Sequence, residues 1–334
     1  IKPSEFTPAT SEVLSEMIEE AYDTNEVALF TGGPEVGQAF SGLAFDHMIF
    51  TGATSIARHI MSAAARNLVP VTLELGGKSP VLISRTADIK TAISRIMLGK
   101  TMNAGQICLA PDYLMVPEEK LDEVVAEIES IVAQMYPSLL ANPQYTSVVN
   151  DRHFQRLSEN VRDAREKGGE VIEVNPAGED FSSQQGTYKI PPTIIKNATD
   201  DMRVLEEEIF GPLLPIKTYK DFNETIDYVN SKPRPLAVYY FGRDNVEERN
   251  VLDRTTSGGV CLNDVIMHIM QEDLPFGGVG PAGMGAYHGY DGFKTFSHAK
   301  GIYKQSKLDI AGLGGMRPPY GKKTESTIKM QTKV

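Results

Sequence analysis

The sequence predicts an α/β fold in which helices cover both faces of a parallel sheet. Three observations favour this fold. Strand patterns alternate with helical patterns through the first 75 residues, the alternation resumes at Pro80, and 41% apolar with 23% charged residues is typical of a globular chain. A length of 334 residues allows two compact units. In such folds ligands bind at the carboxyl ends of the strands.

The first elements follow from hydrophobic periodicity. Apolar residues between Val13 and Ala21 recur on one face of a helix that starts at Thr10 or Ser11. The Gly32-Gly33-Pro34 turn then separates a short strand from a second helix. The predicted order is a strand at 27–30, a helix ending at 43, a strand at 48–51, a helix from 54 to about 66 and a strand at 71–75.

The second part of the chain repeats the alternation. A helix over 121–135 is predicted because apolar residues recur at helical spacing after Pro117, with Glu118 and Glu119 in the first turn, where they favour the helix dipole. The stretch 175–187 reads as a surface loop. The other predicted elements are a helix near 89–98 and strands at 80–84, 192–195, 213–216, 236–241 and 259–262.

Charge and composition exclude several classes of partner. A net charge of −11 and a pI near 5.1 repel nucleic acid and anionic lipid surfaces, so a small molecule is the expected ligand. The two cysteines lie too far apart in sequence for a disulfide framework, which favours a reducing compartment, the cytoplasm. No apolar run reaches about 18 residues and no leader precedes the first helix, so neither a membrane span nor a signal peptide is expected.

Cys108 and Glu74 are the residues best placed for chemistry. Cys108 lies among small residues and turn formers, and this context is equally compatible with a nucleophile and with a buried structural thiol. Cys261 lies in a predicted apolar strand, which indicates a core residue. Glu74 ends an apolar strand just before a Gly-Gly turn. It could be a general base, because burial raises a carboxyl pKa, or it could pair with Lys78 across the turn.

Six short motifs of the sequence are more specific as an ordered set than any one of them is alone. They are Lys2-Pro3-Ser4-Glu5, Phe50-Thr51-Gly52, Glu74-Leu75-Gly76-Gly77-Lys78, Gly105-Gln106-Ile107-Cys108, Glu208-Ile209-Phe210-Gly211-Pro212 and Pro275-Phe276-Gly277-Gly278. This set resembles the aldehyde dehydrogenase superfamily over residues 1 to about 300. The segment 283–298 is similar to the class 3 branch, and within it to coniferyl aldehyde dehydrogenases. Ala57 departs from the glycine common after the cofactor turn, and Tyr287 and His288 stand where many members have an acidic residue.

The resemblance implies a fold and an organisation. It implies a Rossmann-like parallel-sheet NAD(P)-binding domain, of which residues 1–76 are the C-terminal part, an α/β catalytic domain over 77–275, and a return segment and tail over 276–334 with possible oligomer contacts. It also implies that the chain is N-terminally incomplete and lacks the asparagine that completes the oxyanion hole. A homodimer is expected.

The resemblance further implies a mechanism without a metal. Cys108 attacks the aldehyde, hydride passes to NAD or, less favourably, NADP, and Glu74 activates the water that hydrolyses the thioester. Whether Glu74 also activates the thiol depends on a low thiol pKa near the cofactor. The implied cofactor residues are Lys2, Glu5, Thr51, Gly52, Ala53, Thr54, Leu75, Glu208 and Phe210.

The substrate and two rival functions remain open at this point. Tyr113, Tyr287 and Phe296 could line an aromatic substrate pocket or belong to the core, and His288 could contact the substrate or be a structural histidine. An aromatic pocket suits coniferyl aldehyde, although a medium or long aliphatic aldehyde is also compatible. One rival is an acylating enzyme that passes the acyl group to coenzyme A, and Glu74 argues against it. The other is a non-catalytic, crystallin-like protein on the same fold, which the joint presence of Cys108, Glu74 and Glu208 disfavours.

Overall fold

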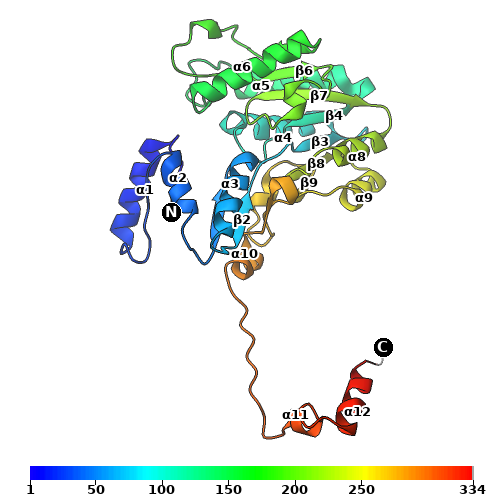
Figure 1. The fold of residues 1–334 in the computed structure, drawn as a ribbon. Helices are drawn as coiled ribbons and strands as arrows, with labels where there is room; N and C mark the ends of the chain where they lie inside the picture. Colours follow the sequence, from blue (N-terminus) through cyan, green and yellow to red (C-terminus); the bar gives the residue numbers. More distant parts are fainter. Residues whose placement is uncertain (333–334) are drawn as a thin grey trace. The chain divides into compact units, whose positions relative to one another are not determined.

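The computed structural model describes residues 1–332 and divides the chain into two units (Figure 1). The first unit ends at Phe296 and the second begins at Ser297. The larger unit contains two sheets, and the expected α/β class is confirmed. Within the described residues, no helix has both the length and the apolar character needed to cross a membrane.

The first sheet has three strands in the order β1-β2-β10. Strands β1 (Met48–Thr51) and β2 (Val71–Glu74) are parallel and joined by helix α3 (Thr54–Ala65), while β10 (Gly283–Met284) returns antiparallel to β2. Leu73 of β2 and Ala57 of α3 pack together in a small apolar cluster. Helices α1 (Pro8–Ala21) and α2 (Pro34–Ser41) precede this sheet in the chain.

The strand expected at 27–30 does not form. Residues 27–30 have no regular secondary structure, and two backbone hydrogen bonds join them to Ile1. The amide of Phe30 donates to the Ile1 carbonyl at 2.9 Å, and the Ile1 amino group donates to the Ala28 carbonyl at 2.6 Å. Two bonds to a single residue do not make a ladder. The prediction of a strand here was therefore wrong.

The second sheet has seven strands in the order β5-β6-β7-β4-β3-β8-β9. All neighbours are parallel except β5 and β6, which run antiparallel. The strands are β3 (Pro80–Ile83), β4 (Tyr113–Pro117), β5 (Glu170–Glu173), β6 (Thr193–Lys196), β7 (Leu213–Tyr219), β8 (Ala237–Phe241) and β9 (Gly259–Leu262). The predicted strand boundaries at 80, 213 and 259 are reproduced.

Helices cover both faces of this sheet. Because strand residues alternate between faces, Val81 and Ile83 pack with α4 (Ile89–Thr101) and α5 (Leu121–Met135), while Leu82 packs on the opposite side. Four helices contribute residues to the apolar cluster on that opposite face: α6 (Asp151–Glu166), α7 (Arg203–Glu206), α8 (Phe222–Ser231) and α9 (Asn245–Arg254). Helix α10 (Gly289–Thr295) ends the larger unit.

The second unit is small. It holds α11 (Ile310–Leu313) and α12 (Lys322–Gln331), the red helices of Figure 1. Hydroxyl groups join them, since Thr324 donates to the Gly315 carbonyl at 2.6 Å and Thr327 to the Gly314 carbonyl at 2.8 Å. Neither helix contributes to a buried apolar cluster.

Parallel strands give the seven-stranded sheet two chemically distinct edges. We call the edge where β3, β4, β7 and β8 begin the amino edge, and the edge where they end the carboxyl edge. The turn at Gly77, the Cys108 loop and the segment 208–212 all directly precede strands, so they meet at the amino edge. Arg85, Asp221 and Asp244 follow strands and lie at the carboxyl edge.

Candidate active site

An unusual backbone places Cys108 at the amino edge. Helix α4 ends at Thr101, and Asn103, Ala104 and Gly105 then take positive φ values of 50°, 52° and 73°. For Asn103 and Ala104 this conformation costs about 1 kcal/mol each, and such strain is typical of functional sites. Gly105 is required, because a Cβ there would lie 2.3 Å from the Gly211 carbonyl oxygen. The loop before Cys108 is thus built against the loop after Glu208.

Gln106 holds the Cys108 loop from the other side. Its amide nitrogen donates to the Ser147 carbonyl at 3.0 Å, and its amide oxygen accepts from the Val149 N–H at 2.9 Å. Both ends of this side chain are therefore satisfied by the segment that leads into α6. This explains why a glutamine precedes the cysteine at this spacing.

The Cys108 thiol is half-buried and hard to ionise. Burial, then the charges of Glu208 and Glu74, raise its pKa to about 11, and backbone N–H groups of Cys108 and Leu109 lower it only in part. The low pKa on which an independent thiolate depends is therefore not found. Because the charges of two carboxylates oppose a third negative charge on this buried thiol, its ionisation needs a base.

Glu74 is the candidate for this base. It ends β2 between Thr51 of β1 and Gly283 of β10, is 5% exposed, and neither carboxylate oxygen has a hydrogen-bond partner within residues 1–332. Burial raises its pKa to about 7. A buried carboxylate without a partner is costly, and a pKa near neutrality suits a group that takes and returns protons.

Lys78 does not pair with Glu74, so the structural alternative for Glu74 is excluded. The Lys78 ammonium instead pairs with Asp112 and donates to the carbonyls of Val204 at 2.6 Å and Glu207 at 2.9 Å. The other Asp112 oxygen accepts the Ile209 N–H at 2.9 Å. This buried pair fixes the turn after Glu74 to the segment that carries Glu208.

Glu208 fits into a space that only glycine leaves open. A Cβ on Gly76 would lie 2.0 Å from a Glu208 carboxylate oxygen. Burial raises the pKa of Glu208 to about 7, against the hydrogen bond from the Gly77 N–H and the nearby charges of Lys78 and Arg156. Arg156 also donates to the Ile209 carbonyl at 2.7 Å.

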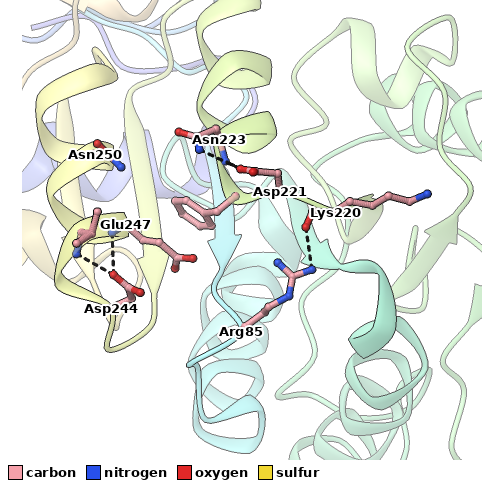
Figure 2. A pocket seen from close by; sticks show the side chains of 9 residues that line it. Arg85, Lys220, Asp221, Asn223, Asp244, Glu247 and Asn250 are labelled. Carbon is pink, nitrogen blue, oxygen red and sulfur yellow. Dashed lines mark hydrogen bonds between the residues drawn. The ribbon is translucent and has the colours of Figure 1, made fainter.

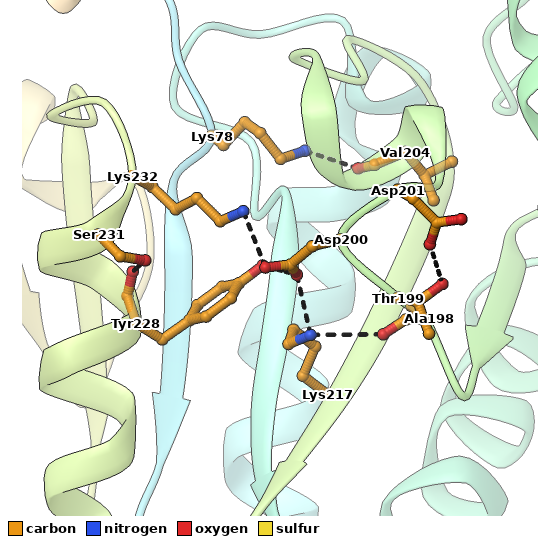
Figure 3. A network of polar contacts seen from close by, with 10 residues as sticks. All are labelled: Lys78, Ala198, Thr199, Asp200, Asp201, Val204, Lys217, Tyr228, Ser231 and Lys232. Carbon is orange, nitrogen blue, oxygen red and sulfur yellow. Dashed lines mark hydrogen bonds and ion pairs between the residues drawn. The ribbon is translucent and has the colours of Figure 1, made fainter.

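The start of the segment that carries Glu208 is anchored by a polar network (Figure 3). Asp200 accepts from Tyr228 at 2.7 Å, Lys217 at 3.0 Å and Lys232 at 3.1 Å. Burial opposes ionisation of Asp200, but these hydrogen bonds outweigh it and bring its pKa to about 2. The segment from Asp200 to Glu208 is therefore held at both ends.

The residues expected to hold the pyrophosphate lie where β1 leads into α3. Gly52 donates its N–H to the Glu74 carbonyl at 3.0 Å, which ties this turn to the base. Ala53 is the N-cap of α3 and offers no side-chain cap, so the first N–H groups of the helix are open to an anion. The Thr54 hydroxyl donates to the Pro281 carbonyl at 3.0 Å.

The remaining cofactor residues surround the same sheet. Lys2 and Glu5 form an ion pair at 3.1 Å, and backbone and Lys2 hydrogen bonds lower the pKa of Glu5. Leu75 is buried and donates its N–H to the Ala282 carbonyl at 3.2 Å. Phe210 has a φ of 46° and is 38% exposed at the amino edge. This set fits a dinucleotide, because open helix N–H groups and a glycine cradle are what its phosphates and riboses need.

The four aromatic residues expected around the substrate fall in different places. Tyr287 packs near Cys108, since burial and then the charges of Glu74 and Cys108 raise its pKa, and its ring lies 4.6 Å from that of His288. The His288 Nδ1 is buried without a partner in the described chain. Phe296 lies 4.9 Å from His47. Tyr113 is 2% exposed in the core against Tyr228, so its ring offers no surface to a substrate.

The carboxyl edge, where ligands were expected, holds a different kind of cavity (Figure 2). Asp221 caps α8 by accepting the Asn223 N–H at 2.8 Å, and Asp244 caps α9 through the Val246 N–H at 2.8 Å. Arg85 donates to the Lys220 carbonyl at 2.9 Å. The side chains at the carboxyl edge of this sheet are thus used to cap helices, whereas Thr51 and Glu74 lie at the carboxyl ends of strands in the smaller sheet.

No metal site accompanies these groups within the described residues, where no three His, Cys, Asp or Glu side chains come together in a suitable cluster. The functional groups at the amino edge are thus a thiol, two carboxylates with raised pKa values and one buried ion pair.

Known proteins share this sequence and fold. Residues 1–302 match the model of the aldehyde dehydrogenase family. A probable coniferyl aldehyde dehydrogenase of Caulobacter vibrioides is 61% identical over all of this chain and 68% of its own length. The coniferyl aldehyde dehydrogenase of a Pseudomonas species is 59% identical over 96% of this chain and 66% of its own. The chain thus spans about two thirds of the length of these relatives.

Solved structures agree. A substrate-bound AldH of Staphylococcus aureus superposes with a TM-score of 0.89 at 37% identity, covering 99% of this chain and 70% of that one. A betaine aldehyde dehydrogenase of the same species, in complex with NAD+, has a TM-score of 0.83 at 27% identity, covering 93% of this chain and 64% of that one.

Proposed function

We propose, because this chain belongs to the aldehyde dehydrogenase family, that its Cys108 and Glu74 oxidise an aromatic aldehyde to the carboxylic acid with NAD(P). The observation that carries the proposal is the buried Glu74 carboxylate, which has no partner within residues 1–332 and a pKa raised to about 7. Its charge also contributes, after burial and Glu208, to raising the pKa of the Cys108 thiol to about 11. Burial disfavours the charged forms of both side chains, so a chemical role is the simplest reason for their positions.

The first step is proton transfer from the thiol. Glu74 accepts the Cys108 proton as the sulfur attacks the aldehyde carbon, which forms the C–S bond of a tetrahedral thiohemiacetal. Neutralising Glu74 removes one of the two charges that oppose the thiolate, so the transfer becomes easier as it proceeds. The Cys108 backbone N–H donates to the oxygen that becomes negative.

The nucleotide is held by the chain's own polar groups. The open N–H groups of α3 receive the pyrophosphate, Lys2 and Glu5 the adenosine ribose, and Glu208 the nicotinamide ribose, with Phe210 packed near the ring. Bound NAD(P) supplies the hydride acceptor. We propose that NAD is preferred, since Glu5 repels an additional ribose phosphate while Lys2 offsets this only in part.

Glu74 acts a second time to release the product. After it has released the Cys108 proton to solvent, Glu74 takes a proton from water, and the hydroxyl oxygen attacks the Cys108 thioester. The C–S bond then breaks to give the acid, and the leaving sulfur receives the proton from Glu74 to restore the thiol. The absence of any partner for Glu74 in the described chain supports this, because no protein donor competes for its buried oxygens. The same observation disfavours transfer to coenzyme A and a non-catalytic role.

The substrate assignment rests on relatives and on aromatic neighbours. The relatives named above act, by their names, on coniferyl aldehyde. Tyr287 lies near Cys108, and the ring centroids of Phe276 and Tyr287 are 5.5 Å apart. Such aromatic neighbours suit a planar aryl ring. Tyr287 and His288 remain the proposed substrate contacts, and Phe296 a more distant one.

An assay of reduced nucleotide tests the proposal. Coniferyl aldehyde and a saturated aliphatic aldehyde are each supplied with NAD or NADP, with and without coenzyme A. We expect fastest turnover with coniferyl aldehyde and NAD, and no stimulation by coenzyme A. Faster turnover of the aliphatic aldehyde contradicts the substrate, coenzyme A dependence contradicts the role of Glu74, and no turnover contradicts the function.

The organisation of the protein completes the proposal. We infer a cytoplasmic homodimer, with cofactor-binding residues in 1–76, catalytic residues in 77–275 and oligomer contacts in 276–334. Light scattering of the purified protein tests the dimer, and fractionation of cells tests the compartment.

A further inference from the structure

A tyrosine hydroxyl holds the backbone directly after the nucleophile. Tyr239 Oη donates to the Leu109 carbonyl at 2.7 Å, and the Tyr239 side chain is fully buried. The Tyr239 backbone lies inside β8, between Val81 of β3 and Cys261 of β9, so the hydroxyl is carried by a strand that is paired on both sides. A buried tyrosine normally has a hydrogen-bond partner, and here the partner belongs to the loop that carries Cys108.

Leu109 connects this hydroxyl to the sulfur through its own two backbone groups. Its N–H is hydrogen-bonded to the Cys108 sulfur and lowers the pKa of the thiol, which burial and the nearby carboxylates raise. Its carbonyl accepts the Tyr239 hydroxyl. A buried carbonyl that loses its donor turns toward another, because an unpaired polar group in the interior is costly. Such a turn at Leu109 moves its N–H away from the sulfur.

A second contact fixes the direction of the hydroxyl. The Ile266 N–H is hydrogen-bonded to the Tyr239 oxygen, so the hydroxyl proton is left to point at the Leu109 carbonyl. Ile266 has a φ of 64°, which is rare for a β-branched residue and is kept only where the surroundings impose it. Burial, opposed in part by the Ile266 N–H, raises the pKa of Tyr239 well above its ordinary value. The hydroxyl therefore stays protonated and remains a donor.

We propose that Tyr239 is a positioning residue for the nucleophile: its hydroxyl holds Leu109 so that the Leu109 N–H faces the Cys108 sulfur and stabilises the thiolate. The catalytic consequence rests on the function proposed above, because it requires Cys108 to be the nucleophile. Tyr239 itself is given no contact with the aldehyde or the nucleotide. It acts on the thiol through the backbone alone.

Three other ionisable side chains surround the thiol. The charges of Glu208 and Glu74 oppose its ionisation, and burial, then the charges of Glu74 and Cys108, raise the pKa of Tyr287. None of these three is altered by a substitution at Tyr239. A change in the reactivity of the thiol in a Tyr239 variant therefore reports the position of the backbone N–H.

Two matched hydroxyl deletions in the full-length protein test the proposal. Tyr239→Phe removes the donor to Leu109, and the control Tyr219→Phe removes another buried hydroxyl that also donates at 2.7 Å, to the Ile83 carbonyl at the carboxyl edge. Alkylation by iodoacetamide at pH 8 proceeds through the thiolate, so its rate follows the ionised fraction of Cys108. We expect this rate to fall by about tenfold in Tyr239→Phe, equivalent to about one unit of thiol pKa, and by less than about twofold in Tyr219→Phe.

The conditions separate position from folding and from function. Cys108→Ala gives the background from Cys261, and saturating NAD is present throughout, because a bound ligand stabilises the folded state. Alkylation needs no aldehyde, so a protein that oxidises no aldehyde contradicts the proposed function and leaves the alkylation result standing. Where aldehyde is oxidised, the burst of reduced nucleotide should slow by about tenfold in Tyr239→Phe, with the nucleotide dissociation constant unchanged.

Three outcomes overturn the proposal. The first is alkylation of Tyr239→Phe at the wild-type rate. The second is equal slowing in both variants, since the effect would then be general to a lost buried hydrogen bond. The third is a Tyr239→Phe protein that does not fold with NAD while Tyr219→Phe does, because the hydroxyl would then hold the fold rather than the thiol.

Discussion

The carboxylates at the carboxyl edge of the seven-stranded sheet and those around its amino edge differ in their hydrogen bonding. At the carboxyl edge Asp221 and Asp244 cap helices and Glu119 pairs with Arg85 at 2.7 Å, so each carboxylate has its donor. Glu74, which ends β2 of the smaller sheet just before the Gly77 turn of the amino edge, has none within the described residues, and burial raises the pKa values of both Glu74 and Glu208 to about 7. The difference teaches that a cavity with satisfied polar groups is structural, whereas unsatisfied buried groups mark the place of chemistry.

Removal of the nucleophile is the most severe test of the amino edge. Cys108→Ala should lower turnover by about 10,000-fold or more, because no other side chain can form the acyl intermediate. The residue is small and half-buried, so the melting temperature and nucleotide binding should stay near those of the wild type. Residual turnover within tenfold of the parent enzyme would remove Cys108 from the mechanism.

Removal of the base should have the next largest effect. Glu74→Gln keeps the side-chain shape and should slow steady turnover by about 100- to 10,000-fold. Because the thiol pKa is about 11, formation of the acyl enzyme should slow too, so that the pre-steady-state burst of reduced nucleotide becomes slow as well. Stopped-flow measurement decides between the roles: a burst at wild-type rate would restrict Glu74 to activation of water.

The raised pKa of Glu74 also predicts how stability depends on pH. In the unfolded chain the group ionises near its model value of 4.5, and in the folded chain near 7, so the folded state binds more protons between these values. The free energy of unfolding should therefore fall as pH rises from 4.5 to 7, by about 3 kcal/mol for this group. Glu74→Gln removes the ionisation, and urea titrations at pH 5 and pH 8 should show the variant gaining stability over the wild type only at pH 8.

A substitution at the carboxyl edge should have the smallest effect, and this effect should be on stability rather than on turnover. Asp244→Ala removes the cap of α9 and should cost about 1 kcal/mol of unfolding free energy, with turnover unchanged. Urea denaturation and the nucleotide assay on the same preparation measure both. A loss of turnover of more than twofold at constant stability would show that this cavity belongs to the active site. It would contradict the assignment of a structural role to the carboxyl edge.

Motifs in the sequence singled out the candidate reacting groups, and hydrophobic periodicity predicted the class of fold, which the structure confirms. Cys108, Glu74 and Glu208 could be singled out because each stands where an ordinary strand or helix would not place it. Helix α6 was missed because it is mostly charged and shows only Phe154, Leu157, Val161 and Ala164 on its apolar face. That spacing, three and four residues apart, was the available signal.

The supporting contacts could not be predicted from the sequence. Asp112 precedes β4 with no local feature to distinguish it, yet it joins Lys78 to the Ile209 N–H. Likewise, nothing near Gly76 in the sequence shows that the Glu208 carboxylate occupies the space of its missing Cβ. Such contacts join residues that are distant in the chain, so only the folded backbone reveals them.

The contact between Gly105 and Gly211 also limits how this protein can be engineered. Directed evolution for new aldehydes acts by enlarging or shrinking side chains, but here the nucleophile loop and the ribose loop touch through backbone atoms alone. Substitution of Gly105 displaces the backbone, since the Gly211 carbonyl cannot move away by changing rotamer, whereas a side chain at Gly211 would meet the side chain of Leu157. Diversity is better placed at Met267 and Met270, on a short 3-10 turn whose side chains are exposed and can change size without moving the loops.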